Sequence, residues 1–181
     1  MRAATGWLMD APFLVRPSLI SESFAVPWKS QPQSKSWTYR TPCSTSRRAR
    51  RQLFANEAPP GVAPPNGYSH VVSGRGRLVA VAGQVALDER GAVVGVGDPA
   101  AQARQVFENL RWCLASAGAG FADVVKLGVY VTDMAYLPAL RAARDAVVDT
   151  ARPPASTAVQ VVALARPEFL IEVDALAMVV D

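Results

Sequence analysis

The sequence predicts an α+β fold in which two helices lie on one face of a single mixed sheet. Strands are indicated where residues alternate with a period of two, at 125–132, 157–162 and 169–179. Helices are indicated at 98–118 and 133–150, where apolar residues recur three and four positions apart. Each helix carries a single apolar stripe, so both should cover the same sheet face and leave the other face bare.

Residues 1–57 are expected to be a disordered N-terminal extension of the domain at 58–181. The extension is rich in Ser, Pro and Arg, has no sustained period, and ends in the basic run RRARRQLF. This composition is typical of organelle transit peptides, but it also fits a basic arm that touches RNA or anionic lipid, or translated sequence upstream of the true start. Residues 1–55 hold nine basic and two acidic side chains, whereas the remainder holds ten and thirteen. The net charge of +4 therefore belongs to the extension, and the domain is not expected to bind nucleic acid.

The two cysteines, Cys43 and Cys113, lie in different parts of the chain, so no structural disulfide is expected between them. Two thiols of this kind fit a reducing compartment. We expect a cytoplasmic location, with organelle targeting by the extension as the alternative. No run approaches the roughly 18 apolar residues of a membrane span, so no membrane partner is expected.

The first part of the domain is expected to form short β-structure. A Pro/Gly-rich loop at 58–67 leads to a short strand at 68–73, a glycine turn, and a partner strand at 78–82 that is apolar enough to be buried on both faces. Gly83 follows, where a glycine either forms a bulge or lets another group approach the backbone closely. An irregular hairpin is expected at 85–96.

Both predicted helices have recognisable starts. Asp98 is placed to cap the first helix, Pro99 occupies its first position, and Gly118 ends it. Cys113 lies beside the apolar stripe and is expected to fill the core rather than to react. Asp133 is placed to cap the second helix.

The last strand carries two carboxylates in an unusual place. In 169–179 one face is purely apolar, and the other holds Glu172 and Asp174 among large apolar residues. A carboxylate on a half-buried strand face is costly unless it is paired or used. Both acids therefore either pair with Arg or Lys across a subunit contact or take part in a site. The half-apolar bare face also predicts self-association.

The sequence has no motif for a metal, a nucleotide or a nucleophilic triad. It contains no P-loop, the glycine pair at 74–76 precedes a strand rather than a helix, and the two cysteines are far apart. His70 is the only histidine and no G-x-S-x-G run is present, so His70 is expected to be a polar residue at a strand edge. Any chemistry is expected to use Glu or Tyr side chains, backbone amides and water, with no metal and no cofactor.

Six segments in order resemble the RidA family, also called YjgF or L-PSP. The resemblance covers roughly residues 60–181 and none of the extension. The segments are P-x-G-Y-S-H at 65–70, V-A-V-A-G-Q at 79–84, A-A-Q-A-R-Q-V-F-E-N-L at 100–110, G-A-G-F-A-D-V-V-K-L-G-V-Y-V-T-D at 118–133, P-x-S-T-A-V-Q-V-x-x-L at 154–164 and I-E-V-D-A-L-A at 171–177.

The resemblance implies a chorismate-mutase-like α+β domain and a homotrimer whose sheets form a central barrel. It places three sites in the clefts between subunits, which agrees with the bare sheet face expected from the periodicity. It also implies hydrolysis of reactive enamines and imines to carbonyl compounds and ammonia, with a small imine, enamine or related molecule as the ligand.

Three site residues follow from the resemblance by motif. Glu172, in I-E-V-D-A, matches the Glu that positions water and is the expected catalytic residue. Tyr68 matches the site Tyr of the family, and Gly83 matches the Gly of the strand-end G-Q. Both are expected to contact the substrate.

The segment Ser156–Ala158 matches the remaining part of the substrate site but departs from it at one position. Active deaminases of the family have an Arg in P-A-R-S-x-V that binds the substrate carboxylate, and Ser156 takes its place here. Ser supplies no fixed cation, and neither Arg152 nor Arg166 has the right spacing. Thr157 and the backbone amides near Ala158 are still expected to line the site, where an amide can bind an oxygen.

The expected function is that of an enamine or imine deaminase-like hydrolase, similar to 2-iminobutanoate/2-iminopropanoate deaminases, with a substrate altered by the loss of the Arg. Substrates without a carboxylate, or with one bound elsewhere, are favoured. The alternative is a non-catalytic trimer that binds a small ligand or a protein in the same cleft. RNA cleavage, attributed to some family members, is disfavoured because phosphate contacts need basic residues and the domain is acidic.

Overall fold

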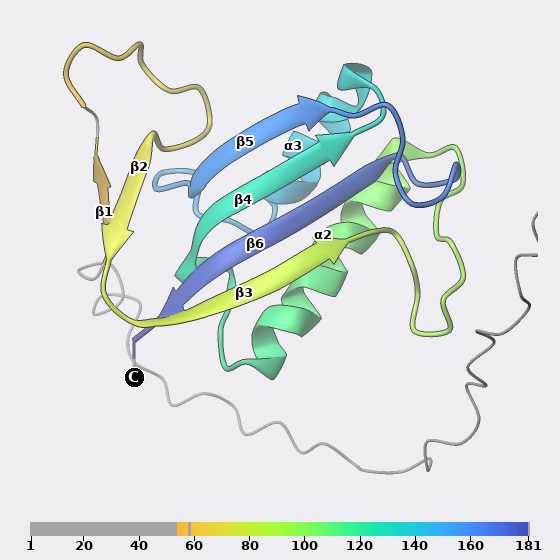
Figure 1. Cartoon of the computed structure of the whole chain (residues 1–181), viewed down its shortest axis with the longest axis horizontal. Helices are drawn as coiled ribbons and strands as arrows, with labels where there is room; N and C mark the ends of the chain where they lie inside the picture. The colour runs from red at the N-terminus through yellow and green to blue at the C-terminus, as the bar shows by residue number, and fades with distance from the viewer. Residues whose placement is uncertain (1–53, 58, 181) are drawn as a thin grey trace, which may run out of the picture. The chain divides into compact units, whose positions relative to one another are not determined.

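A four-stranded mixed sheet forms the centre of the structure, a computed structural model that describes residues 54–57 and 59–180 (Figure 1). The strands are β3 (Arg77–Gln84), β4 (Val124–Val131), β5 (Ala155–Gln160) and β6 (Ile171–Val179). Their order in the sheet is β3-β6-β4-β5. β4 and β5 run parallel, and β6 is antiparallel to both of its neighbours. β3 and β5 are therefore the two edge strands of this sheet.

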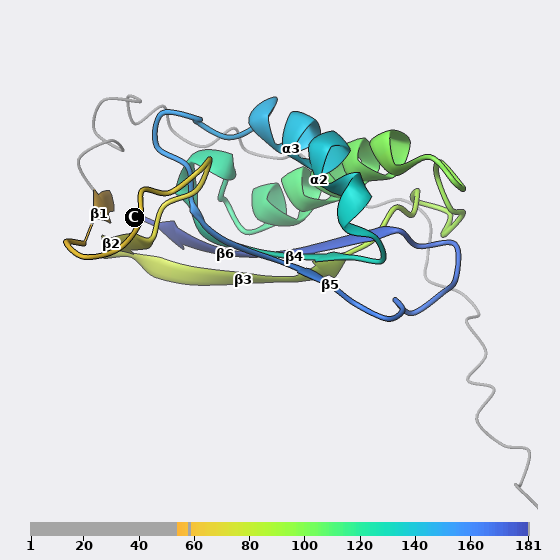
Figure 2. The same ribbon diagram turned by 90° about the horizontal axis from the view of Figure 1, so that it is seen from above.

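Two helices, α2 (Pro99–Ser116) and α3 (Leu137–Asp145), cover one face of the sheet (Figure 2). The α2 helix begins where the sequence predicts, because the Asp98 carboxylate accepts hydrogen bonds from the first backbone N–H groups, at 2.8 and 3.0 Å. Gly118, with φ +71°, follows its last turn. The predicted α+β arrangement, with both helices on one side of a mixed sheet, is confirmed.

The α3 helix is shorter than the predicted helix at 133–150. Asp133 caps a 3-10 helix, η2 (Met134–Tyr136), by accepting the Ala135 N–H at 2.8 Å, and α3 begins only after it. A second 3-10 helix, η1 (Phe121–Asp123), leads into β4. Among the helices of the described ranges, none has the length and apolar character needed to cross a bilayer.

The irregular hairpin expected at 85–96 is present. A single bridge joins Leu87 to Val93, and the Asp88 carboxylate accepts the N–H groups of Arg90 and Ala92 at 2.9 and 2.8 Å. The turn of this hairpin therefore lies at residues 88–91.

A separate two-stranded sheet consists of β1 (Phe54–Glu57) and β2 (Val71–Gly74). The predicted pairing of 68–73 with 78–82 is wrong, because β2 pairs with β1 and β3 pairs with β6. The nine residues of β6 offer β3 a longer apolar partner than the four residues of β2. The β1 strand falls in the expected extension, and residues 1–53 lie outside the described residues.

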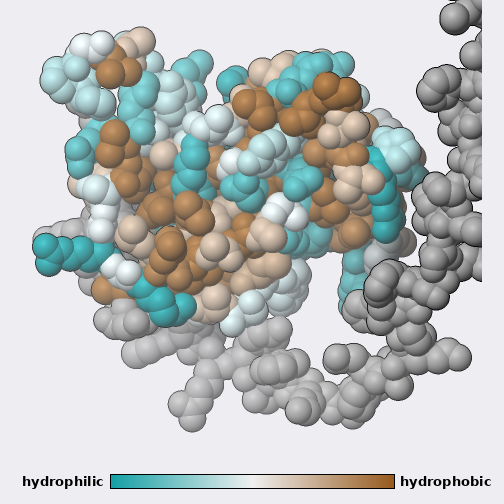
Figure 3. Space-filling view, viewed as in Figure 1, coloured by the Kyte–Doolittle hydropathy of each residue, from teal (hydrophilic) through white to brown (hydrophobic). Residues whose placement is uncertain are grey.

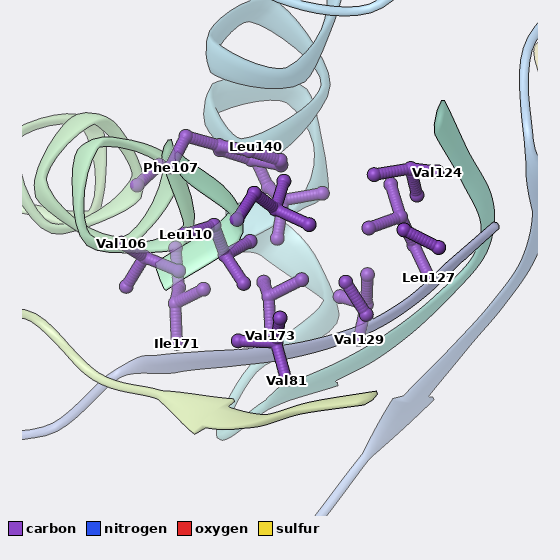
Figure 4. Close-up of a cluster of buried hydrophobic side chains, with 14 of the residues drawn as sticks. Val81, Val106, Phe107, Leu110, Val124, Leu127, Val129, Leu140, Ile171 and Val173 are labelled. Carbon is purple, nitrogen blue, oxygen red and sulfur yellow. The ribbon is translucent and has the colours of Figure 1, made fainter. Parts of the chain in front are cut away.

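The core lies between the helices and the sheet (Figure 4). On the core-facing side of β6, four residues are at most 1 % exposed, as the period of two predicts, and Val179 at the strand end is partly buried; the four are Ile171, Val173, Ala175 and Ala177. The facing stripe of α2 is fully buried; its residues are Val106, Leu110 and Leu114. Cys113, a free thiol, packs against this core as predicted.

The β3 strand is buried on one face only. Val79 and Val81 face the core, whereas Leu78 is 61 % exposed on the opposite side and Ala80 is exposed as well. The prediction that 78–82 is buried on both faces is therefore wrong for this chain. Its apolar character reflects a sheet whose second side no described helix covers (Figure 2).

Candidate active site

The sheet face opposite the helices, here called the open face, mixes apolar and ionisable side chains. The strand alternation places on it Leu78, Ala80 and Ala82 of β3, Lys126, Gly128 and Tyr130 of β4, and Glu172, Asp174, Leu176 and Met178 of β6. Figure 3 shows this side of the molecule, with apolar residues gathered over the strands. The two carboxylates predicted to share a face therefore do so.

The Glu172 carboxyl group lies directly against Gly83 of the neighbouring strand. A Cβ atom at Gly83 would stand 1.9 Å from Glu172 Oε1, so the glycine lets the carboxyl group take a position that any larger residue would force it to leave. The contact exists because the register between β3 and β6 shifts between Val81 and Gln84, which is a β-bulge. Both interpretations of Gly83, a bulge and a close approach, are thus correct.

Asp174 occupies a similar position against Gly128. A Cβ atom at Gly128 would lie 2.6 Å from both carboxylate oxygens. The Gly128 N–H donates to Asp174 Oδ1 at 3.2 Å, and the Tyr130 hydroxyl donates to Asp174 Oδ2 at 2.9 Å. This hydrogen bond, together with the negative charge of Asp174, raises the pKa of the Tyr130 hydroxyl above its usual range.

Neither Glu172 nor Asp174 forms an ion pair with another described residue of the chain. Lys126, on the same face, instead donates from Nζ to Thr157 Oγ1 on β5. Within the described residues, no ion pair therefore neutralises either carboxylate. Pairing with Arg or Lys across a subunit contact stays a prediction.

A second group of predicted site residues lies where Tyr68 meets the start of β5. The neighbouring Ser69 pairs with Ala155, its N–H donates to Pro154 O at 3.1 Å, and its hydroxyl donates to Pro153 O at 2.6 Å. The half-buried Tyr68 ring stands edge-on to His70 at 5.2 Å between ring centroids. Because Ser69 lies opposite Ala155, these contacts place Tyr68 near the start of β5, where Ser156 is the second residue.

The three β5 residues of the predicted site point in different directions. Ser156 pairs with the buried Leu127, so its side chain lies on the helix side of the sheet, whereas Thr157 lies on the open face. The Val161 N–H donates to Val131 O on β4 at 2.9 Å. By alternation, the Ala158 N–H points away from β4, toward the edge of the sheet, where an amide can meet a ligand oxygen.

The two groups of site residues are not adjacent within one chain. Glu172 pairs with Tyr130, and Tyr130 pairs with Val159, so β6 and β5 are separated by β4. Two strand spacings amount to about 9.5 Å. The structure thus brings Glu172 against Gly83 and places Tyr68 near the start of β5, where Ser156 lies, but β4 separates these two groups.

Tyr130 and Lys126 were missed by the sequence analysis. The alternation of 125–132 does place Tyr130 and Lys126 on one strand face together with Gly128. The alternation of 169–179 separately places Glu172 on a face of another strand. That these two strand faces belong to one sheet face follows only from the strand order, in which β4 lies next to β6. In the described ranges no three His, Cys, Asp or Glu side chains are placed to hold a metal ion.

This fold and this site define an α+β protein of the RidA class. The sequence model of the family described as Endoribonuclease L-PSP matches residues 58–179, and the chain belongs to this family, as the resemblance predicts.

Relatives and solved structures agree with this membership. The chain is 34% identical over 133 residues to protein DfrA of Myxococcus xanthus, covering 73% of the chain and 98% of the relative. It is 36% identical over 121 residues to the 3-aminoacrylate deaminase RutC of Acinetobacter baylyi, covering 67% of the chain and 94% of the relative. A solved structure of YyfB from Yersinia pestis, a protein of unknown function of the conserved Rid family, is 41% identical with a TM-score of 0.65, covering 70% of the chain and 99% of that protein.

Proposed function

We propose that the chain hydrolyses the C–N bond of small imines and enamines, with Glu172 holding the attacking water. The observation that carries the proposal is the Glu172 carboxylate, which lies against Gly83 without an ion pair in the described chain. A carboxylate held in place and not neutralised is suited to accept a proton from water. The relative RutC supports the reaction class, because 3-aminoacrylate is by its name an amine on a carbon–carbon double bond.

The proposed reaction converts a protonated imine and water into a carbonyl compound and ammonium. The water oxygen adds to the imine carbon while Glu172 accepts one water proton and the C–N π pair moves to nitrogen. Glu172 then returns this proton to the nitrogen of the carbinolamine. The C–N bond breaks with its electron pair leaving on ammonia, the C–O double bond forms, and the hydroxyl proton passes through Glu172 to the ammonia. One carboxylate thus serves first as base and then as acid.

The proposed substrates either lack a carboxylate or bind it away from position 156. Ser156 offers no charge, and its side chain lies on the helix side of β5. The outward Ala158 N–H and Tyr68, whose neighbour Ser69 pairs with Ala155, instead suit a neutral or weakly polar group. This substrate range differs from that of relatives with an Arg at this position.

The proposed assembly is a homotrimer with each site completed between subunits. Within one chain, Glu172 on β6 lies two strand spacings, about 9.5 Å or more, from β5 and the neighbouring Tyr68. The apolar residues of the open face, with Leu78 61 % and Leu176 38 % exposed, give copies of the chain a surface to bury. Light scattering should give three times the chain mass, and a monomer would contradict the assembly.

Ammonia release from freshly generated imines tests the proposed function. The full chain is offered a carboxylated and an uncarboxylated imine, and release is compared with that in buffer alone. Faster release from the uncarboxylated class is expected, and Glu172→Ala should abolish it. Release at the buffer rate from both classes would refute the proposal.

A second candidate function, a non-catalytic ligand- or protein-binding module, is favoured by one observation. The position that binds substrate in active relatives holds Ser156, while the rest of the segment is kept. Ligand binding without turnover in the ammonia assay would favour this function. RNA cleavage is disfavoured because residues 56–181 carry thirteen acidic and ten basic side chains.

A further inference from the structure

Tyr130 lies opposite Glu172 on the open face, and its hydroxyl is held by Asp174. Tyr130 and Glu172 are directly cross-strand on the open face, a relation that places their Cβ atoms about 4.5–5.5 Å apart. The charge of Glu172 also raises the pKa of Tyr130, after the larger effects of Asp174 and of burial. Tyr130 is therefore the cross-strand neighbour of the proposed catalytic residue.

Asp174 fixes the direction of the Tyr130 proton. Its carboxylate is confined against Gly128, where a Cβ atom would come within 2.6 Å of both oxygens, and it accepts the Gly128 N–H at 3.2 Å. The Tyr130 hydroxyl donates to it at 2.9 Å. A phenol has a single proton to donate, so Tyr130 Oη presents only lone pairs to any other neighbour.

We propose that Tyr130 is a further catalytic residue that binds the attacking water together with Glu172, and that Asp174 is its positioning residue. A water molecule has two protons. If one is donated to Glu172 and the other to Tyr130 Oη, the water lone pairs point away from both groups, toward the imine carbon. The water proton donated to Glu172 is transferred to it as the C–O bond forms. Tyr130 keeps its own proton, which stays hydrogen-bonded to Asp174.

This inference rests on the proposed function and is tested with full-chain variants in the ammonia assay. Tyr130→Phe removes the acceptor, and kcat is expected to fall about tenfold, as for one lost hydrogen bond in the transition state, while KM changes less than about twofold. Tyr136→Phe is the matched control, because Tyr136 lies on η2, packs against the core and makes no hydroxyl hydrogen bond in the described chain. It should leave kcat and the melting temperature unchanged.

Double variants separate a catalytic role from a structural one. In a Glu172→Gln background, Tyr130→Phe should cause no further loss, because both side chains act on the same water. Asp174→Asn should lower kcat in the wild-type background but not in the Tyr130→Phe background, because it acts through Tyr130.

Three outcomes would overturn the inference. If wild type and the Glu172 variants behave as proposed but Tyr130→Phe keeps kcat within about twofold, the inference fails and the function stands. Fully additive losses in the double variants, with a fall in melting temperature above about 5 °C for Tyr130→Phe, would show a structural role. No turnover by the wild-type chain would overturn both.

Discussion

Replacing Gly83 with Ala should lower activity strongly and change the stability of the fold little. Gly83→Ala adds one Cβ atom, which would stand 1.9 Å from Glu172 Oε1 and 2.8 Å from its Cδ. Ordinary van der Waals contact begins at 3.4 Å, so the carboxylate must retreat by about 1.5 Å, the difference between the two distances. Gly83 is exposed and the Glu172 side chain is only half-buried, so the fold can accommodate this movement.

The expected loss is large, because misplacing a reacting group by about 1 Å can cost about a hundredfold in rate. We therefore predict that Gly83→Ala lowers kcat for ammonia release by about a hundredfold or more, with the free energy of unfolding in urea changed by less than about 1 kcal/mol. Gly120→Ala is the matched control. It makes the same change at an extended residue, φ −145°, where a Cβ atom meets nothing closer than 4.0 Å.

Wild-type activity in Gly83→Ala would refute the reasoning, because it would mean that the position of the Glu172 carboxylate does not matter for turnover. A large loss of stability in Gly83→Ala, with Gly120→Ala unaffected, would also contradict it. In that case Gly83 would be needed for the stability of the sheet rather than for the position of Glu172.

Four further predictions follow from the same contacts. Ser156→Arg should raise kcat/KM for a carboxylated imine by at least about tenfold, and leave the uncarboxylated imine unchanged, because it restores a fixed cation. Leu110→Ala should destabilise the fold by about 2–5 kcal/mol in urea unfolding, because the side chain is fully buried against β6. Asp98→Ala should cost about 1 kcal/mol in the same measurement, through the loss of two capping hydrogen bonds at 2.8 and 3.0 Å. The difference in ultraviolet titration between wild type and Tyr130→Phe should report a phenol that ionises above about pH 10, and Asp174→Asn should lower that value. A pKa raised on folding means that Tyr130 stabilises the fold below its unfolded pKa, and that this contribution disappears as pH rises through the folded value.

Patterns with a strict period were sufficient to predict the helix-covered side of the fold. The alternation of 169–179 predicts which face of β6 is buried, and Asp98, Pro99 and Gly118 define both ends of α2. The pairing of β2 with β1 was beyond prediction, because β1 comes from a segment with no period. Likewise, the apolar run of β3 cannot distinguish burial on both faces from one buried and one open face.

The candidate site was predictable only in part, for a different reason. Glu172 stands out because a carboxylate on a half-buried strand face is costly, and its proposed role is implied by the family resemblance. Its contact with Gly83 depends on a bulge, which changes the register without leaving a distinct sequence pattern. Tyr130 shares a face with Glu172 only because β4 lies beside β6, and strand order is a property of the whole chain.

The central claim is that the Glu172 carboxylate drives imine hydrolysis, and one comparison tests it most directly. The rate of ammonia release is measured for the full-length wild type, for Glu172→Gln, and for Glu168→Gln, which removes the same charge at an exposed residue. We predict release well above the buffer rate for wild type and Glu168→Gln, and a loss of at least about a hundredfold in kcat for Glu172→Gln, as for a general base. Equal rates for the wild type and Glu172→Gln would contradict the account.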